Sequence, residues 1–157
     1  MFKFFLGICF LGISTFSFAE PQTWYFVRHF EKQSGDNPSL TSQGKSRADN
    51  LAKYFTDKPL TAIFSTEYNR TQETAAPVAK LKMLKTQHYD PRNLSQFADQ
   101  LKSKNHLLVV GHSNTTPQLI QLMGGTLFVI AEFDFGVLYI MQKNGDKLGV
   151  SESIIPL

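Results

Sequence analysis

The chain has 157 residues, of which 42% are hydrophobic and 18% are charged. This is the length of one domain, and the composition is apolar enough for a packed core. The formal net charge of +3 is too small to predict binding to nucleic acid.

Residues 1–19 differ from the rest of the chain. Lys3 is their only charge, residues 4–18 are almost wholly apolar, and Ser17 and Ala19 are small residues placed before a cleavage point. This pattern is typical of a secretory signal peptide. The apolar run is also shorter than the roughly 20 residues that a transmembrane helix needs.

We therefore predict a signal peptide over residues 1–19 and one mature domain over residues 20–157, which is periplasmic or secreted and has no membrane anchor. Cys9 is the only cysteine, so the mature domain has no disulfide, thiol nucleophile or thiolate metal site. Ile8 stands where a lipoprotein signal needs a small residue, which argues against a lipid anchor.

Strands and helices alternate through the mature domain. The short apolar run over residues 23–27 predicts a buried strand. Thr41 is the predicted N-cap of a helix whose apolar residues recur at helical spacing as far as Phe55. Residues 60–64 predict a second strand, and the helix after it carries Pro77, which we expect to kink or interrupt it.

The second half continues the alternation. Residues 83–89 predict a weak strand, residues 94–101 an amphipathic helix and residues 107–110 a central strand. Pro117 suits the first turn of a further helix, and Asn144-Gly145 is a strong hairpin turn signal. The fold class is therefore α/β, a three-layer αβα sandwich with a mostly parallel central sheet.

Polar residues suited to one task follow three of these strands. Arg28 and His29 follow the first, Arg70 opens the helix after the second, and His112 follows the central strand. Parallel strands place ligand sites beyond their carboxyl ends, so we expect these side chains to meet. An arginine guanidinium can donate two parallel hydrogen bonds to two phosphate oxygens, and a helix N-terminus also favours an anion. A histidine side chain can act as the nucleophile that attacks phosphorus. The set predicts a phosphoryl site, although an isolated Arg-His pair would be unremarkable.

Four ordered segments resemble the histidine phosphatase (phosphoglycerate mutase-like) superfamily. They are Arg28-His29 with Glu31, Leu40-Thr41 with Gly44 and Arg47-Ala48, Ser65 to Ala75, and Val109 to Ser113. The resemblance spans about residues 23–142. It implies a phosphoglycerate mutase-like fold and a phosphomonoesterase that uses a phosphohistidine, needs no metal or other cofactor, and acts on a small phosphorylated substrate.

The resemblance also implies roles for individual residues. His29 is the nucleophile, and Arg28, Arg70 and His112 bind and polarise the phosphoryl group. One departure is Phe30, where familiar members have glycine, and its bulky ring is expected to narrow the pocket.

The proton donor is the second departure. Acid phosphatases of the family have aspartate after the second histidine, where this chain has Ser113. The interval before His112 is also too short for the insertion that supplies a glutamate in mutase-like members. We predict Asp90 as the catalytic donor, because it follows a predicted strand and precedes Pro91. Glu132 is the next candidate, and water or the substrate itself is the alternative to both.

Two other functions stay open at this point. Small single-domain members of the family dephosphorylate phosphohistidine in proteins, but phosphorelay proteins are cytoplasmic, which conflicts with export. A non-catalytic phosphate or phosphosugar-binding module would keep the basic pocket without a competent acid. The substrate and the oligomeric state do not follow from the sequence.

Overall fold

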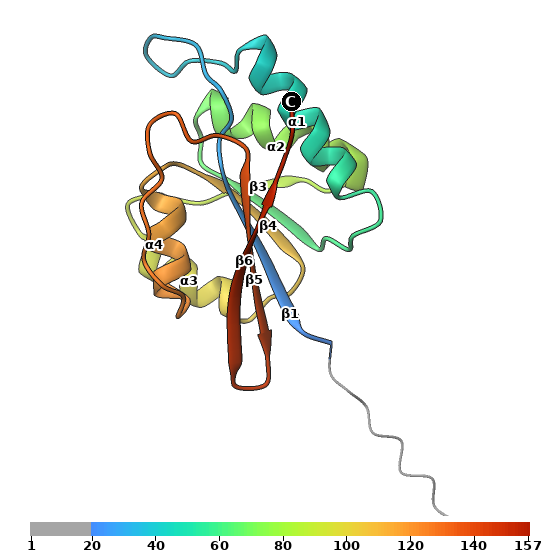
Figure 1. Cartoon of the computed structure of the whole chain (residues 1–157), viewed down its shortest axis with the longest axis vertical. Helices are drawn as coiled ribbons and strands as arrows, with labels where there is room; N and C mark the ends of the chain where they lie inside the picture. The colour runs from blue at the N-terminus through green and yellow to red at the C-terminus, as the bar shows by residue number, and fades with distance from the viewer. Residues whose placement is uncertain (1–19) are drawn as a thin grey trace, which may run out of the picture.

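The computed structural model describes residues 20–157, so the predicted signal peptide lies outside the described residues (Figure 1). The elements follow in chain order. They are β1 (Gln22–Arg28), α1 (Ser42–Tyr54), β2 (Ala62–Ser65), α2 (Asn69–Lys82), β3 (Thr86–His88), α3 (Leu94–Lys102), β4 (Leu107–Gly111), α4 (Thr115–Leu122), β5 (Val137–Asn144) and β6 (Lys147–Ile154). Within this part of the chain, no helix combines the length and apolar character needed to cross a membrane.

The strands form one six-stranded sheet in the order β3-β2-β4-β1-β5-β6. The first four in this order pair in parallel, and β5 and β6 add an antiparallel hairpin at one edge. In the register, Arg28 lies opposite Gly111, and Ser65 lies opposite Val110. The carboxyl ends of β1, β2 and β4 are therefore level with one another, at one edge of the sheet.

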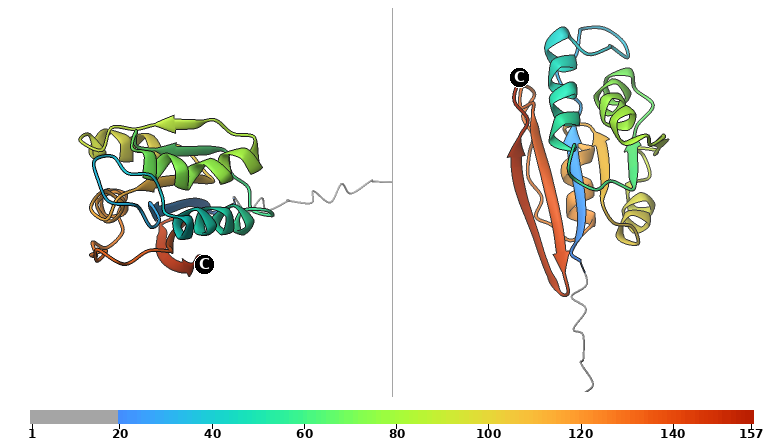
Figure 2. Two further views of the ribbon diagram at one scale, coloured as in Figure 1. Left: turned by 90° about the horizontal axis from the view of Figure 1, so that it is seen from above. Right: turned by 90° about the vertical axis from the view of Figure 1, so that its right-hand side faces the viewer.

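Helices cover both faces of the sheet, with α1 and α2 on one side and α3 and α4 on the other (Figures 1 and 2). Strand β1 alternates between the two cores. Trp24 and Phe26 pack in the core under α3 and α4, whereas Tyr25 and Val27 pack in the core under α1 and α2. A strand buried on both faces has a continuous apolar sequence, and the predicted αβα architecture is confirmed.

Three details of the local predictions differ from the structure: α2 is not interrupted at Pro77, β3 is shorter, and the hairpin turn is shifted. Helix α2 is continuous through Pro77, because Ala75 and Val78 on either side of it are fully buried and tertiary packing overrides weak propensity. Strand β3 contains only three residues, as it lies at the sheet edge. The hairpin turn falls one residue later than expected, between the paired Asn144 and Lys147.

The segment from Leu40 to Ala48 is a scaffold for the end of β1. The Thr41 hydroxyl accepts a hydrogen bond from the Gly44 amide and caps α1. A Cβ at Gly44 would clash with the carbonyl of Glu31, so only glycine allows the helix to pack this closely. Arg47 then binds the Glu31 carboxylate at 2.6 Å. These contacts fix the chain immediately after His29.

Candidate active site

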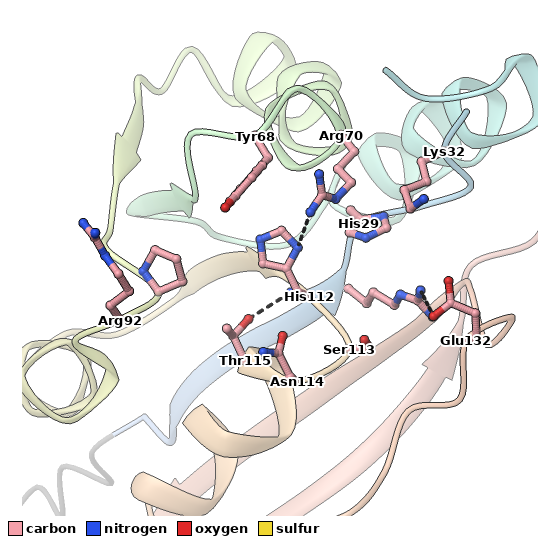
Figure 3. A pocket seen from close by; sticks show the side chains of 12 residues that line it. His29, Lys32, Tyr68, Arg70, Arg92, His112, Ser113, Asn114, Thr115 and Glu132 are labelled. Atoms are coloured by element: carbon pink, nitrogen blue, oxygen red, sulfur yellow. Dashed lines mark hydrogen bonds and ion pairs between the residues drawn. The ribbon is translucent and has the colours of Figure 1, made fainter. Parts of the chain in front are cut away.

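The carboxyl ends of β1, β2 and β4 open into a cavity of about 430 Å³ (Figure 3). Arg28 and His29 come from the end of β1, Arg70 from the first turn of α2, and His112 from the residue after β4. The structure thus brings together the four side chains that the sequence predicted as a phosphoryl site. The other lining residues are Lys32, Tyr68, Pro91, Arg92, Ser113, Asn114, Thr115 and Glu132.

The two histidine rings lie side by side at the centre of the site. Their centroids are 5.6 Å apart, with the planes inclined at 67°. Tyr68 meets His112 edge-on at 5.1 Å, and Phe135 lies 6.2 Å from His29. Each imidazole therefore has an aromatic neighbour that limits its movement.

Each arginine also stacks on an aromatic ring. The guanidinium carbon of Arg28 lies 4.4 Å from the ring centre of Phe135, and that of Arg70 lies 4.4 Å from the ring centre of Tyr68. The Nε atoms of both arginines are buried and have no hydrogen-bond partner among the described residues. Buried donors are nearly always satisfied, so the two unpartnered Nε groups distinguish these arginines from structural ones.

His29 is prepared as a nucleophile by its backbone contact. Its Nδ1 lies 2.8 Å from the carbonyl oxygen of Phe30, so Nδ1 carries the proton and donates it. Nε2 then keeps a free lone pair. Burial, assisted by the charge of Arg28, lowers the pKa of His29 to about 3. The ring is therefore neutral at physiological pH.

His112 is held in the opposite tautomer. Arg70 can only donate, so His112 Nδ1 accepts from its guanidinium at 3.4 Å. Nε2 therefore carries the proton and donates to the hydroxyl of Thr66 at 3.0 Å. The backbone amide of His112 donates to Thr115. Burial, followed by the charge of Arg70, lowers the pKa of His112 to about 4.

Phe30 does not narrow the cavity, so that expectation was wrong. Its ring is completely buried in the core beneath α1. The regular alternation of β1 ends at Arg28, and Phe30 packs in the same core as Tyr25 and Val27. Its backbone amide donates to Thr74 of α2, which ties the end of β1 to the helix that carries Arg70.

Asp90, the predicted proton donor, does not reach this cavity. Its carboxylate lies in a neighbouring depression and is bound by Arg92 at 3.0 Å. Hydrogen bonds from Arg92 lower the pKa of Asp90, which favours the carboxylate over the acid. Pro91, the next residue in the sequence, lines the cavity, but Asp90 does not.

Glu132 is the only carboxylate among the described residues that line the cavity. One of its oxygens lies 3.9 Å from the Arg28 guanidinium. The sequence analysis placed it second to Asp90, which follows a predicted strand, and the structure places Glu132 in the long connection between α4 and β5.

Several residues of the site were not predicted. Tyr68 and Thr66 fall inside the Ser65 to Ala75 motif, but nothing in the sequence marks them as neighbours of His112. Phe135 comes from the same connection as Glu132, more than 100 residues after the arginine on which it stacks. In the described part of the chain, no group of three or more histidine, cysteine, aspartate or glutamate residues could hold a metal ion.

Comparison with known proteins agrees with this geometry. A sequence model of the histidine phosphatase superfamily (branch 1) matches residues 24–92, which include Arg28, His29 and Arg70. This part of the chain is therefore similar to the histidine phosphatase superfamily. The match supports an enzyme of the phosphatase class. A search of curated proteins gave no match.

Solved structures show the same fold. A protein from Escherichia coli K-12 assigned as an alpha-ribazole-5′-P phosphatase is 18% identical, with a TM-score of 0.70 over 87% of this chain and 100% of that one. The protein histidine phosphatase SixA in complex with tungstate is 14% identical, with a TM-score of 0.65 over 84% and 96%. The mycobacterial glucosyl-3-phosphoglycerate phosphatase Rv2419c is 9% identical, with a TM-score of 0.66 over 86% and 98%.

Proposed function

We propose that this chain is an exported, metal-independent phosphomonoesterase that acts on a small phosphorylated substrate through a phosphohistidine at His29. The observation that carries the proposal is the neutral His29 ring, whose Nε2 lone pair is free beside two arginines whose buried Nε atoms have no hydrogen-bond partner among the described residues. Such an arrangement suits a nucleophile that attacks a doubly charged phosphoryl group.

Binding comes first in this mechanism. Arg28 and Arg70 would donate to the phosphoryl oxygens from their unpartnered Nε atoms. Burial keeps the His112 ring neutral, and the negative charge of a bound dianion favours its protonated form. His112 can then take up a proton on Nδ1 and donate a hydrogen bond from it to a phosphoryl oxygen. SixA binds tungstate, a tetrahedral oxyanion like phosphate, which supports an oxyanion at the equivalent place here.

Chemistry then takes two steps. The lone pair on His29 Nε2 attacks phosphorus, and the bond from phosphorus to the leaving oxygen breaks. Water attacks the phosphohistidine in the second step, and the electron pair of the P–N bond returns to Nε2. Fixed donors and positioning supply most of the acceleration in phosphoryl transfer.

The test uses the protein that begins at Glu20, with 4-nitrophenyl phosphate and a panel of alkyl phosphomonoesters, in the presence of a chelator. We expect turnover, a burst of nitrophenol, and an acid-labile phosphate on His29. His29→Ala should abolish all three, whereas His88→Ala, at an exposed histidine, controls for the loss of an imidazole. Full activity in His29→Ala would refute the mechanism, and activity that needs added zinc or magnesium would favour a metallophosphatase.

Two neighbouring functions are distinguished by further arms of the same experiment. Hydrolysis of a phosphohistidine protein, with none of the small esters, would indicate a protein phosphatase. Tight binding of phosphate without turnover would indicate a binding module. Export is tested separately: the N-terminus should be Glu20 and the protein should lie outside the cytoplasm, and an uncleaved cytosolic chain would contradict this.

A further inference from the structure

The loop from Ala131 to Phe135 closes one side of the active site, and it is built around Arg28. The guanidinium donates to the carbonyl oxygen of Ala131 at 2.8 Å and lies over the ring of Phe135. Asp134 folds the loop into a tight turn, because its carboxylate accepts from the amide of Ala131 at 3.1 Å. Its own amide donates back to the Ala131 carbonyl. This turn presents Glu132 at its corner.

The corner position aims Glu132 at the phosphoryl site. Glu132 lines the cavity (Figure 3) and lies beside Arg28. Its oxygen lies 3.9 Å from the guanidinium, which is longer than a tight ion pair. The side chain of Glu132 is 69% exposed whereas that of Arg28 is 5% exposed. The carboxyl group therefore lies at the mouth of the cavity, where the alcohol half of a bound ester leaves.

Resting on the proposed function, we infer that Glu132 is the general acid that protonates the leaving oxygen. It is the only carboxyl group among the described lining residues, and Asp90 lies outside the cavity.

Glu132 gives up a proton in the first step and regains one in the second. As His29 Nε2 bonds to phosphorus, the P–O bond to the leaving group breaks and the Glu132 proton passes to that oxygen, which releases an alcohol. The Glu132 carboxylate then takes a proton from the attacking water. Inorganic phosphate leaves, the P–N bond electrons return to His29, and Glu132 is protonated again.

A general acid is needed in proportion to the basicity of the leaving group. We therefore compare Glu132→Gln with the wild type on 4-nitrophenyl phosphate, an activated phenol ester, and on glycerol 2-phosphate, a poor alkyl leaving group. The expected kcat loss is about 10²- to 10⁴-fold on the alkyl ester, the usual contribution of general acid catalysis. The nitrophenyl ester should lose much less, and its burst should persist.

The matched control is Glu67→Gln, which changes an exposed carboxylate in the neighbouring depression and should leave both rates unchanged. The nitrophenyl rate of Glu132→Gln shows that the variant is folded. Equal losses on both esters would mean that Glu132 only positions Arg28, and no loss on either would give the proton to water; both results overturn the inference. A wild type inactive on both esters refutes the proposed function itself, and the inference with it.

Discussion

Nε2 of His112 lies 3.0 Å from the hydroxyl oxygen of Thr66, and this contact decides which nitrogen of His112 faces the cavity. The Thr66 hydroxyl donates a hydrogen bond to the Thr71 hydroxyl at 2.8 Å, and the Thr71 hydroxyl donates to the carbonyl oxygen of Tyr68. Both threonines are fully buried. This chain of hydrogen bonds from His112 through Thr66 and Thr71 leads away from the cavity. It keeps the proton of His112 on Nε2, so Nδ1 is the nitrogen that faces Arg70.

Replacing Thr66 with valine should therefore impair catalysis without removing a group that touches substrate. The variant leaves the Nε2 proton of His112 without an acceptor, and an unpaired buried donor costs about 1–3 kcal/mol. We expect kcat to fall roughly 5- to 100-fold, since about 1.4 kcal/mol corresponds to tenfold, with a smaller change in KM.

Thr66→Ser is the control for this prediction, because it restores the hydroxyl and should recover most of the rate. The measurement is kcat and KM on 4-nitrophenyl phosphate, together with the imidazole nitrogen resonances of His112. A valine variant with wild-type kcat would show that this chain of hydrogen bonds has no catalytic importance.

The two arginines should differ in what their loss does to the fold. Arg28 donates to Ala131 and also stacks on Phe135, so it supports the loop as well as the substrate. Arg70 contacts only Tyr68 and His112 within the site. We expect Arg28→Ala and Arg70→Ala each to lower kcat about 10²- to 10³-fold, the usual cost of one preorganised donor.

Only Arg28→Ala should also lower the free energy of unfolding appreciably. The loop then loses both the hydrogen bond from Arg28 to the Ala131 carbonyl and the stacking of Arg28 on Phe135, and a hydrogen bond from a charged group contributes about 1.5–3 kcal/mol. Denaturant unfolding of both variants gives the measurement. Equal destabilisation by the two changes would mean that Arg28 does not organise the loop.

The sequence predicted the site residues that directly follow a strand, and it did not predict those that reach the site only through tertiary contacts. Arg28, His29, Arg70 and His112 were found because each directly follows an apolar strand, and parallel strands bring their carboxyl ends to one edge. The fold class followed from the same alternation of strands and helices.

The parts that were missed depend on tertiary contacts. Glu132 and Phe135 lie in a connection without periodicity, and its path is fixed by tertiary contacts such as those with Arg28. The position of Phe30 was wrong because the chain leaves β1 after Arg28, and the Phe30 side chain then packs in the core beneath α1. Asp90 lies outside the cavity, and its carboxylate forms an ion pair with the exposed side chain of Arg92. No motif or periodicity in the sequence indicates this pair.

Asp90→Asn tests the discarded assignment directly. The carboxylate is solvent exposed and paired with Arg92 outside the cavity. Exposed ion pairs contribute little, so we expect kcat to change less than about threefold on both aryl and alkyl esters. A selective loss on the alkyl ester would return the donor role to Asp90 and would count against Glu132.

The stability of the free enzyme should depend on pH through its buried neutral histidines. The pKa of His29 is about 3 in the folded protein, against 6.5 for an ordinary histidine. Between these values the unfolded chain binds a proton that the folded protein excludes. The contribution of His29 is therefore fully present above pH 6.5 and is lost progressively as the pH falls towards 3.

His29→Gln removes this proton difference, so its effect appears in a slope rather than in an absolute value. Each such histidine adds about 1.4 kcal/mol per pH unit to the dependence of the free energy of unfolding on pH. Denaturant unfolding between pH 4.5 and 6, within the window set by the two pKa values, should give a shallower slope for the variant by about that amount. His112, with a pKa of about 4, keeps the remaining slope in the variant. A variant as steep as the wild type would mean that His29 is already protonated in the folded protein, and a charged His29 has no free lone pair with which to attack phosphorus.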